Sequence, residues 1–349
     1  MSFSSIESSA AFKDAKLRPP PSLAIVVPCY NEEDALPFLL QRLEQLDSEL
    51  MKSGMILAPL ELLLIDDGST DKTWTLIEGA NTSLQVKGVR LSRNFGHQHA
   101  LYAGLIQADA DVVVSMDADL QDDPSAIVEM LAAYARGADV VYGVRGCRAT
   151  DTWFKRWSAQ KYYGLLSSMG VDLIPDHADF RLMSRKALSA LSEFGETNLF
   201  LRGLVRQVGF ASETVTYDRP KRTAGESKYP LHKMIALALE GITSFSIRPL
   251  RMITMLGFLI AGNAFIFAAY SILAWMLGKT IPGWTSTVVP IYMLGGLHLV
   301  ALGVIGEYVG KIYQETKGRP RFIIDKTVTS GAVTAPISIA HAKASMTSR

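Results

Sequence analysis

Five short apolar runs, each followed by a segment with helical spacing, recur between Ser22 and Asp218. They are rich in β-branched residues and lie at 22–27, 61–65, 86–91, 111–116 and 139–144. Strands that alternate with helices predict an α/β domain with a mainly parallel sheet and helices on both faces. Such sheets bind ligands beyond the carboxyl ends of their strands. The stretches PCYNEE, DDGSTD, SRNFGHQHA, DADLQDD and RGCR follow the five runs, so we expect the functional site there.

After Tyr217 the pattern becomes that of a membrane protein. Residues 229–246 carry apolar side chains at helical spacing and predict an amphipathic helix, packed on the domain or lying on a membrane surface. The RPLR that follows favours the membrane surface. Residues 252–277 and 280–306 contain no charge, and each run exceeds the roughly 20 residues that cross the hydrocarbon core. We therefore predict two transmembrane helices in preference to buried core helices.

Basic residues around the apolar runs predict the topology. Arg248 and Arg251 precede the first run, further lysines and arginines follow the second, and only Lys279 lies between them. By the positive-inside rule, both ends of the chain are cytosolic. The predicted parts are a flexible N-terminal segment at 1–21, a cytosolic domain at 22–227, an interfacial helix at 228–250, a transmembrane hairpin at 251–307 and a cytosolic C-terminal segment with a disordered tail at 308–349.

Composition supports the membrane assignment. The 349 residues are 48% apolar and 20% charged, and the mean hydropathy of +0.17 is high for a soluble protein of this length. A net charge of +1 gives no electrostatic reason to expect a nucleic-acid partner. The two cysteines, Cys29 and Cys147, lie far apart without metal-binding spacing, and we expect both to be reduced.

The stretch MDADLQDDP, residues 116–124, places four carboxylates directly behind an apolar run. Like charges at the end of a buried strand are unfavourable unless a cation lies between them, and Mg²⁺ or Mn²⁺ suits oxygen ligands. We interpret Asp117, Asp119 and Gln121 as metal ligands in preference to a polar turn. An extended chain points the two aspartates to one side, whereas a turn separates them. The remaining DDP predicts a helix start, with Asp123 as the cap and proline next.

Two other polar stretches have different expected roles. DDGSTD places two successive aspartates at the sheet's edge, and it predicts a turn at Gly68 with Ser69 or Thr70 capping the next helix. The two histidines of SRNFGHQHA straddle a predicted helix start, so we expect them to diverge and not to share a metal ion. Arg93 and Asn94 are expected to contact a ligand or to brace a loop.

Basic residues gather in the stretches after the fifth run and before the membrane. Surface cations usually serve solubility, but these fall where a phosphate at the membrane surface would lie, and guanidinium groups suit phosphate. They are Arg145, Arg148, Lys155, Arg156, Lys161, Arg222 and Lys228.

Eight ordered motifs give the chain a resemblance to the family 2 glycosyltransferases that act on polyprenyl phosphates, above all the bacterial branch of bactoprenol glucosyltransferases. Dolichol-phosphate mannosyltransferase and the undecaprenyl-phosphate aminoarabinose transferases are further relatives. The motifs span roughly Ser22 to Ile324. They are VVPCYNEE, LLIDDGSTDKT, RNFGHQHALYAG, MDADLQDDP, YGVR, ADFRLMSR, FLRGL and GESKYPLHKM.

This resemblance implies an A-type nucleotide-sugar glycosyltransferase domain, followed by an interfacial helix and two transmembrane helices of a bacterial inner-membrane protein. It implies a UDP-sugar donor, a polyprenyl phosphate acceptor, Mg²⁺ or Mn²⁺, contact with membrane lipid, and a homo-oligomer such as a tetramer. The residues it assigns to the nucleotide sugar are Pro28, Tyr30, Glu32, Asp67 and Asp117. It assigns Asp117, Asp119 and Gln121 to the metal. Those it assigns to the acceptor phosphate are Arg145, Lys155, Arg156, Arg222 and Lys228.

For catalysis, the resemblance points to Asp119, Arg145 and Asp179, the last at a position sometimes assigned as a base. An acceptor phosphate has a second pKa near about 6 and is already mostly dianionic at neutral pH, so it needs little help from a base. Asp179 positioning the sugar is the alternative. The reaction implied is an inverting displacement at the sugar's anomeric carbon.

Three alternatives remain. A processive polysaccharide synthase shares the front motifs, but Trp153 stands where its Gln-x-x-Arg-Trp motif requires glutamine, and only two spans are predicted. A non-catalytic membrane scaffold is disfavoured by the intact acidic positions. Glucose is the sugar the resemblance favours, with mannose, galactose, N-acetylhexosamine and aminoarabinose as alternatives.

Overall fold

The computed structural model describes residues 17–145, 177–197, 199–217, 246, 248–278 and 283–329. The chain divides into two compact units. The first comprises Met1–Thr152, Ile174–Ser227 and Pro320–Arg349, and the second Trp153–Leu173 and Lys228–Arg319. Several predicted features lie outside the described residues: most of the interfacial helix, the tail from 330, Cys147, Arg148, Lys155, Arg156, Lys161, Arg222 and Lys228.

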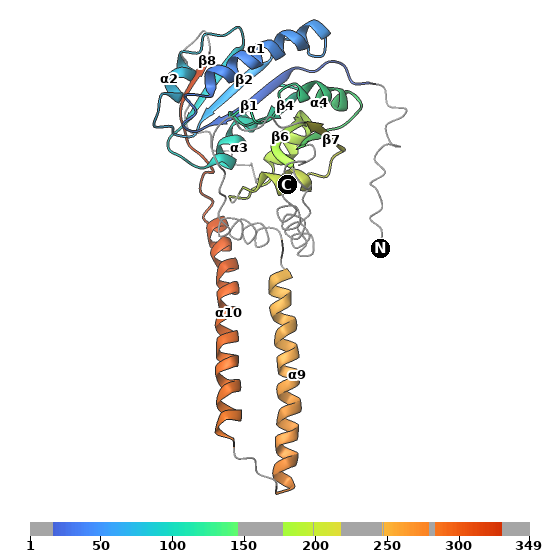
Figure 1. The fold of residues 1–349 in the computed structure, drawn as a ribbon, viewed down its shortest axis with the longest axis vertical. Helices are drawn as coiled ribbons and strands as arrows, with labels where there is room; N and C mark the ends of the chain where they lie inside the picture. The colour runs from blue at the N-terminus through green and yellow to red at the C-terminus, as the bar shows by residue number, and fades with distance from the viewer. Residues whose placement is uncertain are drawn as a thin grey trace, which may run out of the picture. The chain divides into compact units, whose positions relative to one another are not determined.

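The first unit contains an eight-stranded sheet with the strand order β7-β5-β6-β4-β1-β2-β3-β8 (Figure 1). Neighbours β4, β1, β2 and β3 pair in parallel, as do β5 and β7, whereas β6 and β8 run antiparallel to their partners. The five predicted runs all form strands, so the mainly parallel sheet is confirmed. The strands are β1 (Leu23–Cys29), β2 (Glu61–Asp66), β3 (Gln85–Leu91), β4 (Val112–Ser115), β5 (Val140–Arg145), β6 (His177–Ser184), β7 (Ser212–Tyr217) and β8 (Ile324–Thr329).

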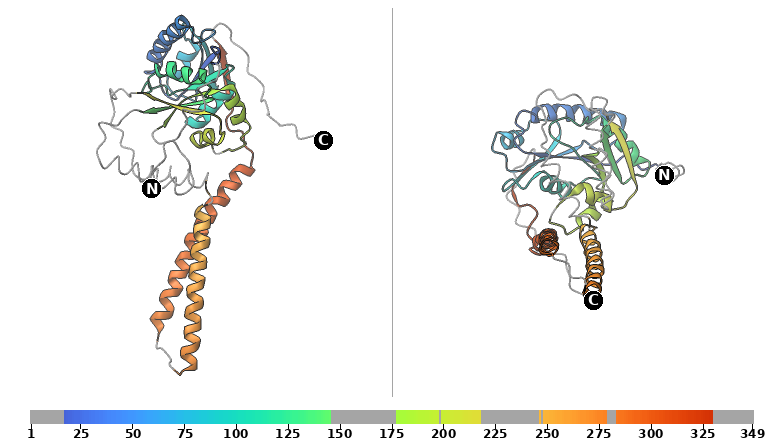
Figure 2. Two further views of the ribbon diagram at one scale, coloured as in Figure 1. Left: turned by 90° about the vertical axis from the view of Figure 1, so that its right-hand side faces the viewer. Right: turned by 60° about the horizontal axis from the view of Figure 1, so that its bottom comes forward.

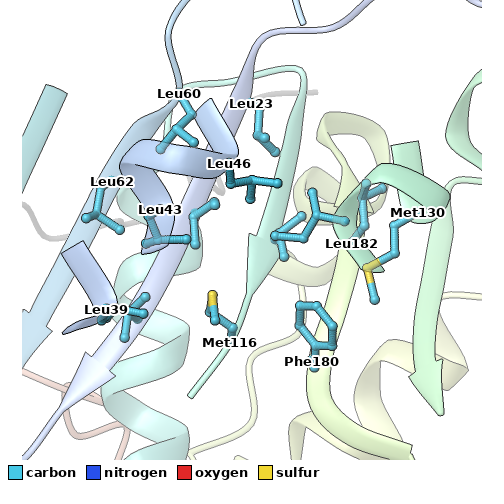
Figure 3. Close-up of a cluster of buried hydrophobic side chains, with 14 of the residues drawn as sticks. Leu23, Leu39, Leu43, Leu46, Leu60, Leu62, Met116, Met130, Phe180 and Leu182 are labelled. Atoms are coloured by element: carbon cyan, nitrogen blue, oxygen red, sulfur yellow. The ribbon is translucent and has the colours of Figure 1, made fainter. Parts of the chain in front are cut away.

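Helices cover both faces of this sheet (Figures 1 and 2). They are α1 (Leu36–Ser53), α2 (Thr73–Glu78), α3 (His97–Gln107), α4 (Ala126–Ala135), α6 (Arg185–Ser192) and α7 (Leu201–Gln207). Leucines at three- and four-residue spacing line the buried face of α1, which ends where Gly54 adopts a left-handed conformation, φ 67°. These leucines form one core with inward residues of β1, β2, β4 and β6, part of which Figure 3 shows.

The opposite face of the sheet packs against α3. Val26 and Ile65 alternate with the strand residues that face α1, because side chains of a strand point to opposite faces in turn. Gly104 of α3 lies so close to this face that a Cβ atom there would come within 2.2 Å of Val26 Cγ1 and 2.9 Å of Ile65 Cγ1. A glycine at this position therefore lets the helix that carries His97 approach the sheet.

Gly104→Val should destabilise the first unit by about 1–3 kcal/mol or more, because the added atoms overpack two buried β-branched side chains. Ile106→Val, on the exposed side of the same helix, is the control and should stay within about 0.5 kcal/mol of wild type. Thermal unfolding of the full chain in detergent measures both. An unchanged melting temperature for Gly104→Val would show that α3 is not held as closely as the structure has it.

Segments at both ends of the domain are attached to it. The guanidinium of Arg18 donates to the carbonyl oxygens of Gly137 and Ala138 at 3.0 and 3.1 Å and pairs with Asp139 at 3.1 Å. Arg18 is therefore attached to the domain, and residues 1–16 of the predicted flexible segment at 1–21 lie outside the described residues. Past the second long helix, Arg321 hydrogen-bonds the Tyr102 hydroxyl and the Phe194 carbonyl oxygen.

The strand β8, which follows Arg321 in the chain, lies at the edge of the sheet. It pairs with β3, which would otherwise expose an unpaired edge. The predicted C-terminal segment at 308–349 thus contains the end of the helix α10 (Trp284–Thr316) and a strand of the central sheet, which the sequence pattern does not predict.

Within its described residues, the second unit contains two helices long and apolar enough to cross a membrane, α9 (Arg248–Met276) and α10 (Trp284–Thr316). Their candidate spans are Arg248–Ala274 and Met293–Thr316, and neither is buried. The Tyr308 hydroxyl of α10 donates to the carbonyl oxygen of Ser246, just ahead of α9, at 2.6 Å. Both helices extend past the predicted hairpin at 251–307, because charged residues continue each helix beyond its apolar run.

Candidate active site

The polar stretches after β1 and β2 are bonded to each other at the carboxyl edge of the sheet. The backbone N–H groups of Asn31 and Glu32 donate to Ser69 Oγ and Thr73 Oγ1 at 3.0 and 2.8 Å. Asn31 adopts a left-handed conformation, φ 56°. The N-cap position of α2 is Lys72, which makes no side-chain cap, so the predicted cap at Ser69 or Thr70 is wrong.

Three residues assigned to the nucleotide sugar lie along this edge. Pro28 is buried within β1, Tyr30 directly after β1 is 46% exposed, and Glu32 is half-buried. Burial raises the pKa of Glu32, and the carboxylates of Asp119 and Asp117 raise it further. Glu32 therefore interacts electrostatically with the two aspartates of the loop that follows β4.

Asp67 is buried and braces the loop ahead of α3. Its carboxylate accepts hydrogen bonds from the backbone N–H groups of Phe95 and Gly96 at 2.7 and 2.9 Å. Burial raises its pKa, and these two hydrogen bonds oppose the rise. Gly68 next to it has φ 70°, and a Cβ there would lie 2.7 Å from the backbone carbon of Arg93, which confirms the predicted turn. Arg93 itself stacks on Phe95, its guanidinium carbon 4.0 Å from the ring centroid.

The acidic loop, residues 116–125, connects β4 with α4. The strand ends at Ser115, and Leu120 has φ 53°, so the aspartates lie on a turn and not on an extended chain. Asp119 is exposed, and its Oδ1 accepts the Gln121 N–H at 3.1 Å. Burial raises the pKa of Asp117, the nearby His97 opposes this, and other carboxylates including Asp119 add to the rise.

The loop offers a partial ligand set for a divalent cation. Within the described residues, no group of three or more His, Cys, Asp or Glu side chains could hold a metal ion. Among the described residues, however, the buried Oε1 of Gln121 has no hydrogen-bond partner, and the Asp119 carboxylate adds to the rise in the pKa of Asp117. Because Mg²⁺ is commonly held by one or two carboxylates together with substrate phosphates, these three residues fit such an ion.

The second half of the acidic loop differs from its prediction. The helix α4 begins at Ala126 with Ser125 as its cap residue, two positions later than expected. Asp123 accepts from the Ser125 N–H at 3.0 Å and from its hydroxyl at 2.6 Å, which forms a local turn ahead of the helix. Asp122, expected on the surface at the helix start, is 1% exposed and accepts a hydrogen bond from the Tyr217 hydroxyl.

Asp179 lies beyond the end of β4, because β6 pairs with β4 so that Ser115 faces Arg181. It is 5% exposed and surrounded by donors. Arg181 Nη2 lies 2.6 Å from Oδ1, and Arg202 contacts both oxygens at 3.2 Å. Gln98 Nε2 donates to Oδ2 at 3.1 Å, and His97 Nε2 lies 3.4 Å from the same oxygen. Among the described residues, these partners are all donors, and they enclose the carboxylate.

His97 joins Asp179 to the acidic loop. Its Nε2 also lies 3.6 Å from Asp117 Oδ1. Burial lowers the pKa of His97, but the two aspartates outweigh burial and raise the pKa above its usual value, which favours the imidazolium. His99 turns away toward the Thr197 carbonyl oxygen at 3.3 Å, so the predicted divergence of the histidines is confirmed.

The charged groups around Asp179 keep its carboxyl group ionised. Burial alone would raise its pKa, but the hydrogen bond from His97 and the guanidinium groups of Arg181 and Arg202 hold that pKa well below its usual range.

The sequence pattern did not indicate His97, Gln98, Arg181 and Arg202 as site residues. Their motifs were visible, but nothing in the spacing indicated that β6, α3 and α7 meet at one carboxylate. Arg145 ends β5, and its side chain lies outside the described residues.

Comparison with known proteins gives the following likenesses. Residues 24–192 match Glycosyl transferase family 2. The chain is 45% identical over 308 residues to the uncharacterized glycosyltransferase YkoT of Bacillus subtilis (strain 168), covering 87% of this chain and 91% of that one. It is 38% identical over 307 residues to the prophage bactoprenol glucosyl transferase homolog of Escherichia coli (strain K12), covering 87% and 98%.

A solved structure also resembles the fold. It is glucosyl-3-phosphoglycerate synthase from Mycobacterium tuberculosis in complex with Mn²⁺, uridine-diphosphate-glucose and phosphoglyceric acid. The likeness has a TM-score of 0.40 at 18% identity and covers 64% of this chain and 77% of the other.

Proposed function

Because this chain belongs to glycosyl transferase family 2, we propose that it moves glucose from UDP-glucose to a polyprenyl phosphate such as undecaprenyl phosphate. The observation that carries the proposal is the likeness to a bactoprenol glucosyl transferase homolog over 87% of this chain. A match of that extent includes residues beyond the catalytic sheet. The two long apolar helices support an acceptor whose phosphate lies at the cytoplasmic face of the bacterial inner membrane. In this proposal the protein is multi-pass with both termini cytosolic, and it forms a homo-oligomer, for example a tetramer.

The proposed reaction is a single inverting displacement. An oxygen of the lipid phosphate forms a bond to the anomeric carbon of the glucose as the bond from that carbon to UDP breaks, so UDP leaves with the electron pair. The acceptor phosphate is already mostly dianionic at neutral pH, since its second pKa is about 6. The residues of the site therefore have to orient two anionic substrates and stabilise the departing diphosphate.

In this proposal, Asp117, Asp119 and Gln121 hold Mg²⁺ or Mn²⁺, which stabilises the charge of the leaving diphosphate when bound. Pro28, Tyr30 and Glu32 border the nucleotide. Asp67 shapes that border through the loop ahead of α3. The proposed acceptor-phosphate residues remain Arg145, Lys155, Arg156, Arg222 and Lys228.

Direct assay of the full chain tests the proposal. Purified protein receives undecaprenyl phosphate, Mn²⁺ or Mg²⁺, and a panel of UDP- and GDP-sugars, and extraction into organic solvent detects the lipid-linked product. We expect UDP-glucose to give that product in the presence of the metal. Product from another sugar nucleotide would correct the donor. Transfer to water or to a growing glycan, with none to lipid, would overturn the assignment.

A further inference from the structure

Asp122 is a buried carboxylate that the proposed reaction does not use. It directly follows Gln121 in the acidic loop and accepts a hydrogen bond from the hydroxyl of Tyr217, which ends β7. Asp122 and Tyr217 are 1% and 5% exposed. A buried carboxylate is costly unless it is hydrogen-bonded, so this bond fixes where the loop can lie.

Tyr217 extends this link to the strand that carries Asp179. Its ring packs edge-on against the ring of Phe180, with centroids 5.3 Å apart and planes at 89°. Phe180 is completely buried and stands between Asp179 and Arg181 in β6. One tyrosine thus holds the end of the acidic loop through its hydroxyl and packs on β6 through its ring.

The loop needs such a restraint, because its own conformation is strained. Leu120, with φ 53°, occupies a left-handed region that side chains with a Cβ rarely adopt and that persists only where surrounding contacts enforce it. Leu120 lies between Asp119 and Gln121, two of the proposed metal ligands. The near end of the loop is fixed by β4, and the Asp122–Tyr217 pair fixes the loop immediately after Gln121.

We propose that Asp122 and Tyr217 are positioning residues that hold Asp119 and Gln121 in the geometry for a divalent cation bound together with the UDP diphosphate. The inference rests on the proposed function for the identity of that ligand. The two residues affect catalysis through the position of the acidic loop. Loss of their hydrogen bond therefore weakens metal binding while the domain stays folded.

The proposal is tested by measuring Mn²⁺ binding to the full chain in detergent, with UDP present. The electron paramagnetic resonance signal of free Mn²⁺ reports how much of the ion is bound. Tyr217→Phe keeps the ring on Phe180 and removes the hydroxyl, and Asp122→Asn removes the charged acceptor. We expect Tyr217→Phe to weaken Mn²⁺ binding by about tenfold, as for the loss of one buried hydrogen bond to a charged group, and Asp122→Asn to weaken it less, because the amide oxygen can still accept from the Tyr217 hydroxyl. The double variant should lose less than the sum of the two single losses, because both substitutions act on the same hydrogen bond.

Tyr102→Phe is the matched control. It also removes a buried phenol hydroxyl, one that accepts from Arg321 and is not bonded to a residue of the acidic loop, and should lower the melting temperature without changing Mn²⁺ affinity. Wild-type Mn²⁺ affinity in Tyr217→Phe, or equal losses in Tyr217→Phe and the control, would overturn the proposal. Wild-type protein that binds no Mn²⁺ with UDP overturns it as well. Wild-type protein that binds Mn²⁺ but transfers nothing to lipid overturns the proposed function and leaves the positioning role standing.

Discussion

Asp119→Asn should abolish sugar transfer and leave the fold intact. The Asp119 carboxylate is exposed on the acidic loop, and the hydrogen bond that it accepts from the Gln121 N–H can also be accepted by an asparagine oxygen. The substitution removes the charge that a divalent cation requires. If the cation stabilises the leaving diphosphate by several kcal/mol, transfer falls by about a thousandfold or more. The measurement is transfer of labelled glucose from UDP-glucose into extracted lipid, beside a melting curve.

Asp123→Asn is the control for this loss, because it makes the same chemical change four residues further along the loop. The Asp123 carboxylate binds the N–H and hydroxyl of Ser125 ahead of α4, which an amide oxygen can partly replace. We expect near-normal turnover and a stability loss of about 1 kcal/mol at most. Near-normal turnover in Asp119→Asn would show that Asp119 is not a metal ligand that transfer requires. Equal loss in both variants would show that loop integrity, and not the charge of Asp119, limits transfer.

The sequence predicted those parts of the fold that have a local signal. The five apolar runs became β1 to β5, the two charge-free runs became α9 and α10, and the eight motifs identified the family correctly. The A-type glycosyltransferase fold with a mainly parallel sheet is thereby confirmed. Each of these features depends on periodicity or on a motif within a few tens of residues.

The parts that were missed depend on long-range contacts. The strand β6 carries Asp179 and Arg181 where a central strand normally has apolar side chains, and the two charges are tolerated there because they pair with each other. The strand β8 pairs with β3 from more than 200 residues away, and no local pattern reports its partner. Asp122 resembled a surface helix start for the same reason, since its hydrogen-bond partner Tyr217 lies 95 residues later.

Asp179→Asn should weaken UDP binding as well as slow transfer, because Asp179 organises the cations of the site. Its carboxylate holds Arg202, Gln98 and His97 together, and His97 reaches Asp117 of the acidic loop. An amide cannot offset these positive charges and would place a donor NH₂ group against other donors. We expect the Kd for UDP to rise by at least about tenfold, which corresponds to about 1.4 kcal/mol. Isothermal titration with UDP and Mn²⁺ measures it independently of turnover.

A catalytic base at Asp179 predicts a different result. Removing a base lowers kcat and leaves the affinity for UDP unchanged, since the proton transfer occurs only in the transition state. The geometry opposes that role, because the carboxylate is enclosed by donors and its pKa is held well below the usual range, so it accepts a proton poorly. Lower kcat with wild-type UDP affinity in Asp179→Asn would nevertheless establish the base.

Asp139→Asn separates this positioning effect from general destabilisation. Asp139 is also a buried aspartate among cations, with Arg18 at 3.1 Å and Lys186 at 3.6 Å, but it precedes β5 and so lies at the opposite end of that strand from the site edge. Losing one partner of the buried Asp179–Arg181 pair costs about 3–5 kcal/mol, and the loss at Asp139 is smaller because Arg18 and Lys186 are partly exposed to solvent. Both variants should therefore melt at lower temperature, and only Asp179→Asn should lose UDP affinity, since only its carboxylate connects to the acidic loop through His97. If Asp139→Asn loses UDP affinity to the same extent, the effect of Asp179→Asn is one of stability alone.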